Sequence, residues 1–487
     1  MSGKITAVFF AAIVVFSSAA LCEARKPNIV FFFIDDLGWA DLGCYGSRYH
    51  QTPNIDALAR RGMRFTDGYA ACPVCSPTRA ALMTGKFPAR LGITDWIGAG
   101  QKRNVLLTPA NVTALPQAEL TFAEVLRDAG YATAYFGKWH LGADDGDHPS
   151  TQGFDYHRGV NRAGAPGSYH YPFRRKGNPG KKPAPHDVPD FKDARQGSYL
   201  TDLLADEAVK FVEKSRDSPF LLLLAHYSVH TPIQARRQDI AQYSARLDKL
   251  GLPAKVGMRP EKYGQTRTTQ NNPAFAGMVA SVDRSVGRVL GKVRELGLEG
   301  DTLVIFTSDN GGLSTLPGKR SAPTSCLPLR AGKGWLYEGG VRVPAIISWP
   351  GVTKPGSVSS VPVVTTDFYP TLLAAAGLPL RPAQHLDGVD LTPLMMGGVL
   401  ERKALYWHYP HYHGSANRPS ASVRKGDYKL VRWYEDGSEE LFNLADDLSE
   451  SKDLALEQKG KRRELAADLD RWLKATGAKM AVPAAGN

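Results

Sequence analysis

Carboxylate and amide side chains, which can bind metal ions, stand at the ends of two predicted strands of this sequence. Asp35 and Asp36 come directly after the apolar run 28–34, and Asp309 and Asn310 come just after the run 302–307. The carboxyl ends of strands in an open α/β sheet form the usual ligand edge, so we expect these four side chains to converge. Adjacent carboxylates repel one another without a cation, and an all-oxygen set favours calcium or magnesium over zinc. Either pair alone is also typical of a helix cap or a tight turn, but both together favour a metal site.

Cys75 stands at the start of a predicted helix over residues 77–83. Free backbone N–H groups and the positive end of the helix dipole suit an anionic or anion-binding group at that position. Cys72 and Cys75 also have C-x-x-C spacing, but the sequence offers no second pair for a four-thiolate zinc site and no evident thioredoxin-like unit. Five cysteines are too few for a disulfide framework in 487 residues.

The segment 75–85, CSPTRAALMTG, resembles the signature of the type I sulfatases, which are arylsulfatase-like members of the alkaline-phosphatase superfamily. Further family-like segments are GKWHLG at 137–142, YSVHTP at 227–232, and GKG at 332–334 followed by EGGVRVP at 338–344. The resemblance covers most of the chain from residue 27 to 388, and more loosely the C-terminal part. It includes bacterial carbohydrate sulfatases, among them enzymes for galactose or N-acetylgalactosamine 4-sulfate.

This resemblance implies a chemistry for the matching positions. A dedicated maturation enzyme would oxidise Cys75 to formylglycine, whose hydrated aldehyde would attack the sulfur of a sulfate ester. His230, with Lys333 nearby, would protonate the leaving oxygen, and His140 would take a proton from the second diol hydroxyl to expel sulfate. The implied catalytic residues are Cys75, Arg79, Lys138, His140, His230 and Lys333. The implied ligands of one calcium ion are Asp35, Asp36, Cys75, Asp309 and Asn310.

The substrate of this predicted enzyme is a sulfated sugar or polysaccharide, with aryl sulfates as artificial substrates. The positive charges of Arg79, Lys138, Lys333 and one divalent metal ion outweigh the negative charges of the three carboxylates. This excess suits a monoanionic sulfate ester. The predicted substrate-binding residues are Lys138, His230, Lys333, His408 and His411. The last two belong to the run YWHYPHYH at 406–413, whose aromatic and imidazole side chains are suited to sugars, although a strand of packed aromatic residues is an equal alternative.

Two other classes of function deserve comparison. A phosphatase or phosphonate monoester hydrolase of the same superfamily would typically use Ser or Thr with two zinc ions, whereas this chain has Cys75 and no evident second histidine-rich set. A secreted, catalytically inactive protein that binds sulfated glycans would not need the complete set of candidate residues. Both alternatives are therefore weaker than the sulfatase.

Composition and the N-terminus bear on partners and location. The sequence has 43% hydrophobic and 22% charged residues, as a globular protein does, and 60 Lys and Arg against 48 Asp and Glu. The net charge of +12 is compatible with anionic substrates, and we predict no nucleic-acid partner. Residues 1–24 are predicted to be a secretory signal peptide: Lys4 precedes an apolar run at 5–16 that is too short to span a membrane. We expect a secreted or periplasmic protein without a membrane span.

Alternating strand and helix patterns predict the fold class as α/β. We expect a large, mostly parallel central sheet sandwiched by helices over 25–396, of the alkaline-phosphatase type that the resemblance implies. A smaller C-terminal α+β subdomain with an antiparallel sheet and a terminal helix is predicted over 397–487. The stretches 155–196 and 234–272 are predicted to be long surface loops because of their polar composition.

Overall fold

The computed structural model describes residue 3 and residues 26–484, apart from 143, 145, 176–183, 189 and 192. The predicted signal peptide, except for residue 3, therefore lies outside the described residues. Within the described part of the chain, no helix is both long and apolar enough to cross a membrane.

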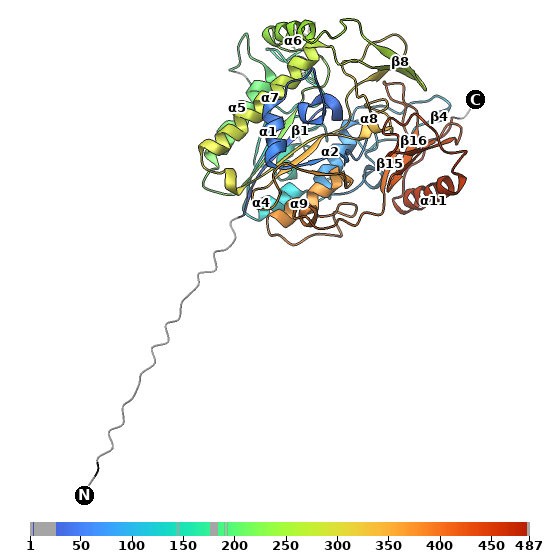
Figure 1. Cartoon of the computed structure of the whole chain (residues 1–487). Helices are drawn as coiled ribbons and strands as arrows, with labels where there is room; N and C mark the ends of the chain where they lie inside the picture. Colours follow the sequence, from blue (N-terminus) through green and yellow to red (C-terminus); the bar gives the residue numbers. More distant parts are fainter. Residues whose placement is uncertain are drawn as a thin grey trace.

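An eight-stranded sheet forms the centre of the molecule, with the strand order β13-β2-β12-β10-β1-β7-β5-β6 (Figure 1). In this sheet β12 runs antiparallel to both of its neighbours, and the other adjacent strands are parallel. The predicted mostly parallel α/β sheet is thus confirmed. Its strands are β1 (Asn28–Ile34), β2 (Met63–Phe65), β5 (Ala132–Gly137), β6 (Tyr156–Arg158), β7 (Phe220–His226), β10 (Thr302–Ser308), β12 (Ala345–Ser348) and β13 (Ser357–Ser359).

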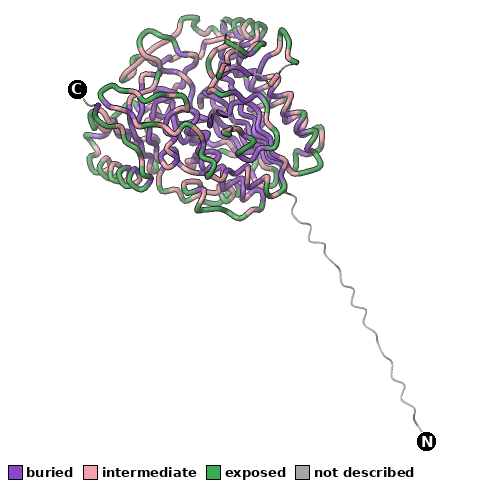
Figure 2. The backbone as a smooth tube through the Cα atoms, turned by 180° about the vertical axis from the view of Figure 1, so that it is seen from behind, coloured by how far each residue is buried: buried purple, intermediate pink, exposed green. Residues whose placement is uncertain are grey.

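Helices cover both faces of this sheet, because strand β1 is apolar at every position after Asn28 and both of its faces must be buried. Alternate side chains, Phe31 for example, pack with α2 (Cys75–Thr84), α4 (Phe122–Asp128) and α9 (Phe368–Ala375). The intervening side chains, such as Phe32, pack with α1 (Pro53–Arg61), α5 (Leu200–Lys214) and α7 (Pro273–Glu295). Figure 2 shows the resulting buried interior of the backbone.

A second, antiparallel sheet occupies the C-terminal part, with the order β15-β16-β17-β18. Its strands are β15 (Leu405–Tyr409), β16 (Ser420–Lys425), β17 (Tyr428–Trp433) and β18 (Glu439–Asn443), and α11 (Lys459–Ala475) packs on it. The sheet is tied to the rest of the chain by a buried ion pair, in which Lys429 Nζ lies 2.7 Å from Glu338 Oε1 at the start of α8 (Glu338–Val341). The elements of the predicted subdomain are present, and its boundary after residue 396 stays a prediction.

The prediction that 234–272 is a surface loop is wrong. This stretch contains α6 (Arg237–Lys249) and the hairpin of β8 (Met258–Glu261) and β9 (Gly264–Arg267), which also pairs with β11 (Thr315–Leu316). Helix α6 buries only Asp239, Tyr243 and Leu247, a single stripe at i, i+4 and i+8 too narrow to stand out in a polar sequence. The remaining short elements are β3 (Gly68–Tyr69), β4 (Leu106–Leu107), β14 (Val363–Val364), β19 (Val482–Pro483), α3 (Pro88–Leu91) and α10 (Thr392–Met395).

Candidate active site

The carboxyl ends of β1 and β10 bring the four predicted oxygen ligands together. The two strands are adjacent and parallel, so the residues that follow them leave the same edge of the sheet. The Asp36 backbone N–H donates to Asp309 Oδ1 at 3.2 Å, and Asn310 Nδ2 donates to Asp36 Oδ1 at 2.8 Å. All four side chains, those of Asp35, Asp36, Asp309 and Asn310, are buried.

These residues fit a hard divalent cation. Asp35 Oδ1 and Asn310 Oδ1 are buried and have no hydrogen-bond partner among the described residues, which is unusual for buried oxygen atoms. Ligand atoms of Asp35, Cys75 and Asp309 lie within 4.8 Å of one another. Burial raises the pKa of Asp35 well above its ordinary value, although Lys138 opposes the rise. A bound cation would satisfy the two oxygen atoms and stabilise the carboxylate charge.

Each carboxylate of this cluster also pairs with a buried cationic side chain. Arg79 Nη2 lies 2.7 Å from Asp309 Oδ2, and its Nη1 donates to the Lys138 carbonyl at 2.7 Å. Lys138 Nζ lies 2.8 Å from Asp35 Oδ2, and Lys333 Nζ lies 2.6 Å from Asp36 Oδ1. Burial favours a raised pKa for Asp36, but Lys333 and His230 more than offset it and hold that pKa below its ordinary value. The pairs therefore fix both partners in one geometry.

Cys75 is the first residue of α2 and is 3% exposed. Every residue of that helix is buried, so packing fixes the backbone from which the Cys75 side chain projects. Burial raises the pKa of the Cys75 thiol, and the nearby Lys138 and Lys333 oppose the rise only in part. An unmodified Cys75 would thus be a protonated thiol at neutral pH, a weak nucleophile.

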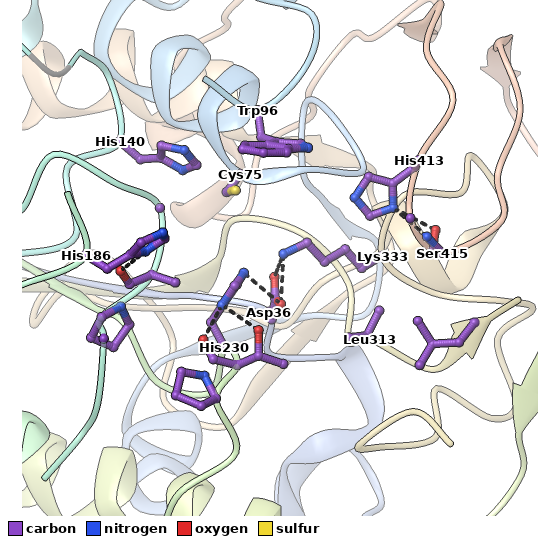
Figure 3. Close-up of a pocket in the computed structure, with 18 of the residues that line it drawn as sticks. Asp36, Cys75, Trp96, His140, His186, His230, Leu313, Lys333, His413 and Ser415 are labelled. Atoms are coloured by element: carbon purple, nitrogen blue, oxygen red, sulfur yellow. Dashed lines mark hydrogen bonds and ion pairs between the residues drawn. The ribbon is translucent and has the colours of Figure 1, made fainter. Parts of the chain in front are cut away.

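A cavity of about 740 Å³ is lined by Cys75, by residues at the sheet edge and by residues of the C-terminal part (Figure 3). Of the predicted site residues, five line it: Asp36, Cys75, His140, His230 and Lys333. It is also lined by residues that the sequence analysis did not select, among them Trp96, Lys102, Arg175, His186 and His413. Most of these belong to irregular segments without a motif. His413 lies in the run 406–413 considered for sugar binding, and Arg175 lies in a basic run of the stretch 155–196 that was expected to be a solvated loop.

The hydrogen-bond partners of His140 and His230 determine which nitrogen of each ring can accept a proton. The Nε2–H of His140 donates to the Ile97 carbonyl at 2.9 Å, and Nδ1 is buried without a partner among the described residues. Burial and then Lys138 lower the pKa of His140 well below its ordinary value. The ring is therefore neutral with an accepting nitrogen, as a base requires.

His230 is arranged differently. Its Nδ1–H donates to the Thr231 carbonyl at 2.8 Å, and its Nε2 lies 3.7 Å from Asp36 Oδ2. Burial, followed by Lys333, lowers the pKa of His230 to about 3, while Asp36 acts in the opposite direction. His230 can therefore donate a proton from Nε2 only after that nitrogen has been protonated.

His408 and His411 do not line the cavity, and the geometry does not support their predicted contact with substrate. Both are buried. Nδ1 of His408 lies 2.8 Å from the Tyr434 hydroxyl, and its Nε2 lies 3.0 Å from the Lys479 carbonyl. Nε2 of His411 lies 2.8 Å from Thr94 Oγ1. These histidines use their ring nitrogens inside the fold, which is the packed alternative considered for this run.

Comparison with known proteins identifies the family. The sulfatase family model matches residues 27–378, most of the chain. This chain belongs to the sulfatase family. The sulfatase is therefore an enzyme that hydrolyses sulfate esters. A second model, the C-terminal part of N-sulphoglucosamine sulphohydrolase, matches residues 331–479.

Relatives cover nearly the whole of the sulfatase. It is 35% identical to arylsulfatase A of Homo sapiens over 451 residues, which are 88% of this chain and 79% of the relative. It is 32% identical to N-acetylgalactosamine-6-sulfatase of Sus scrofa over 435 residues, 86% and 74% of the two chains. The crystal structure of Ps i-CgsB in complex with k-i-k-neocarrahexaose matches with a TM-score of 0.75 and 31% identity over 92% and 93% of the chains. The phosphonate monoester hydrolase of Agrobacterium radiobacter, at 22% identity and a TM-score of 0.63, shares the fold.

Proposed function

We propose that this sulfatase removes sulfate from carbohydrates, with a formylglycine made from Cys75 and one divalent cation, calcium by preference. The observation that carries the proposal is the position of Cys75, which lines the same cavity as Lys333 and lies next to buried ligand-type carboxylates. The cation ligands would be Asp35, Asp36, residue 75, Asp309 and Asn310. Hard oxygen ligands with two unsatisfied oxygen atoms support calcium or magnesium rather than zinc.

The residues around Cys75 divide the work of sulfate-ester hydrolysis. The converted residue would supply a hydroxyl nucleophile, and the cation would neutralise negative charge as the S–O bond breaks. Lys138 and Lys333 would bind the sulfate oxygens, while Arg79 holds Asp309 and the Lys138 backbone in place. The unpartnered Nδ1 of His140 would accept the proton whose removal releases sulfate. His230 would protonate the oxygen of the leaving alcohol, with Lys333 as the neighbouring alternative acid.

A carbohydrate substrate is supported by the cavity and by two relatives. The cavity has the volume of a site for a molecule of sugar size, and the Trp96 ring lies above Cys75 as an apolar face for a sugar (Figure 3). One relative is named for N-acetylgalactosamine 6-sulfate and one structure contains neocarrahexaose. The position of the sulfate on the sugar is open, and the 4-sulfate expected from the sequence is one of the positions to test.

A substrate panel tests this function. Enzyme whose residue 75 has been shown by peptide mass spectrometry to be an aldehyde should release sulfate from at least one monosulfated galactose or N-acetylgalactosamine. Aryl sulfate and aryl phosphate serve as reporters, and we expect a preference for the sulfate because the proposed site would hold one cation rather than two. Converted enzyme that is active on the aryl phosphate and inactive on every sulfate ester would support the phosphatase alternative.

Exchange of His230 for alanine should affect substrates according to their leaving groups. A sugar alkoxide needs a proton as it leaves, whereas a phenolate with electron-withdrawing groups does not. We therefore expect His230→Ala to lower kcat/KM by about a hundredfold or more on a sugar sulfate and by much less on 4-nitrophenyl sulfate. Steady-state kinetics on the two substrates measure the difference.

His140→Ala is the matched comparison for His230→Ala, since both histidines line the same cavity. If His140 releases sulfate from the covalent intermediate, its loss should cause sulfated enzyme to accumulate with either substrate, a change that mass spectrometry detects. Equal losses on both substrates for His230→Ala, measured where S–O cleavage limits the rate, would contradict its role and leave Lys333 as the acid.

Two proposals about biogenesis complete this function. We propose that residues 1–24 direct the chain to the secretory or periplasmic route, since their sequence has the layout of a signal peptide. The partner needed for activity would be a formylglycine-generating enzyme.

A further inference from the structure

Four of the described histidines line the cavity, and three of them share the same hydrogen-bonding arrangement. His140, His186 and His230 each donate one ring N–H to a backbone carbonyl, those of Ile97, Ala165 and Thr231 respectively. A carbonyl only accepts, so in the neutral ring the second nitrogen of each carries a lone pair. These three histidines can therefore accept a hydrogen bond from a ligand but cannot donate one while neutral.

His413 has the opposite arrangement. The backbone N–H of Ser415 donates to His413 Nδ1 at 3.2 Å, and the Ser415 hydroxyl lies 2.8 Å from the same atom. Since a backbone N–H only donates, Nδ1 must be an acceptor, and the proton of the neutral ring is on Nε2. Burial, followed by Lys333 and Lys102, lowers the pKa of His413 to about 3, so the ring is neutral at physiological pH.

The turn that carries His413 is held tightly. The His413 N–H donates to the Asn417 carbonyl at 3.1 Å, and the Ala416 N–H donates to the His413 carbonyl at 3.0 Å. Trp335 Nε1 donates to the Ser415 carbonyl at 2.9 Å, which fixes the turn to the segment after Lys333. A Cβ atom added to Gly334 would lie only 2.3 Å from His413 Nδ1, so the ring lies directly against the backbone there. The imidazole is thus placed before any ligand arrives.

Figure 3 shows the direction of the ring: the nitrogen bonded to Ser415 points away from the cavity, and the other points into it toward Lys333. We propose that His413 binds the substrate, donating its Nε2–H to an oxygen of the sugar outside the sulfate group. A neutral donor suits an uncharged hydroxyl or ring oxygen, while the charged Lys138 and Lys333 suit the sulfate. This inference rests on the proposed carbohydrate function and adds the residue that distinguishes a sugar from an aryl group.

The test compares one variant on two substrates. His413→Ala should lower kcat/KM by about tenfold or more on the preferred sugar sulfate, the effect of one lost hydrogen bond, and by less than about threefold on 4-nitrophenyl sulfate, which has no sugar oxygen. Retained activity on the aryl sulfate also shows that the variant folds. His413→Gln, which offers an N–H at a similar reach on a more flexible side chain, should recover part of the loss on the sugar alone.

His411→Gln is a matched control, because it perturbs the same segment two residues away without touching the cavity. Any effect of that substitution should be equal on the two substrates.

A second test uses deoxy sugar sulfates, each lacking one hydroxyl. If His413 bonds one of these hydroxyls, removing it should cost the wild-type enzyme about as much as His413→Ala, and the two losses should not add. If His413 instead bonds the ring oxygen, His413→Ala should lower kcat/KM by the same factor on every deoxy sugar sulfate. The decrease should still be confined to the sugar substrates.

Equal losses on sugar and aryl sulfate for His413→Ala would overturn the contact, because they would indicate a structural role or contact with the sulfate. So would unchanged activity on both. A converted wild-type enzyme that hydrolyses aryl sulfate but none of the sugar sulfates would instead refute the proposed carbohydrate function, and this inference with it. The two failures are therefore distinguishable from the wild-type measurement.

Discussion

Cys75→Ala is expected to lower the rate of sulfate-ester hydrolysis by at least about ten-thousandfold, the scale on which removal of a catalytic nucleophile acts. Alanine cannot be converted to an aldehyde, and Cys75 is the only cysteine among the described residues that line the cavity. Rates should be measured on 4-nitrophenyl sulfate with a radiometric or coupled assay that reaches the residual level. Peptide mass spectrometry of the wild type should show the aldehyde at position 75.

Cys72→Ala is the matched control, since Cys72 is a buried cysteine three residues earlier and does not line the cavity. It packs among apolar side chains, so its loss should lower the free energy of unfolding by about 1–2 kcal/mol while the rate stays within about threefold. Active wild-type protein with an intact thiol at Cys75 would contradict the formylglycine proposal, whatever the variants do.

Asp35→Asn is expected to abolish the response of the protein to its divalent cation. Asp35 Oδ1 is buried and has no hydrogen-bond partner in the described part of the chain, and an amide keeps the shape of the side chain but loses the charge. A charge contact at about 4 Å is worth about 4 kcal/mol at intermediate dielectric, so activity should fall by about a thousandfold. In wild-type protein, calcium at a hundred times its Kd should add about 2.7 kcal/mol to the free energy of unfolding. In Asp35→Asn this increment should largely disappear.

The free energy of unfolding of the metal-free protein is needed to interpret this experiment. Because burial raises the pKa of Asp35 well above its ordinary value, the ionised carboxylate is unfavourable there without a cation. A neutral amide removes that unfavourable charge but leaves the buried Lys138 ammonium without its carboxylate partner, so the free energy of unfolding of metal-free Asp35→Asn is the baseline from which its calcium increment is measured. Asp128→Asn, with a side chain 67% exposed, is the control that should leave both responses unchanged. Two bound zinc ions per chain, with calcium unable to restore stripped enzyme, would contradict the single-cation site.

Patterns that depend on neighbouring residues in the chain predicted much of this fold. The strand Asn28–Ile34 and the strand Tyr428–Trp433 occupy the positions that their apolar patterns indicate. Thr121 and Glu124 form a capping box that opens α4, a signal contained within four consecutive residues. The convergence of Asp35 and Asp309 also followed from the sequence, because it depends only on two strands ending at one edge of a sheet.

Features that depend on distant parts of the chain were not predictable in this way. His408, His411 and His413 share one run of similar residues, but contacts with Tyr434, Thr94 and Ser415 decide which ring reaches the cavity. Trp96 lines the cavity from an irregular segment, which has no helical or strand periodicity that could indicate where its side chain points. Helix α6 was missed because its stability depends on packing against α7, which begins 24 residues after α6 ends.

The complete burial of α2 limits when Cys75 can be modified. A modifying enzyme needs this segment in its own active site, and in the folded protein Cys75 is 3% exposed with the helix around it enclosed. The proposed modification would therefore have to precede the packing of α2, including its contact with α9, which begins at Phe368. Synthesis of the roughly 290 intervening residues takes on the order of tens of seconds at about 5–20 residues per second. The long separation between the two helices would thus set the time available for the proposed modification. A host that lacks the modifying enzyme would accumulate well-folded, inactive protein.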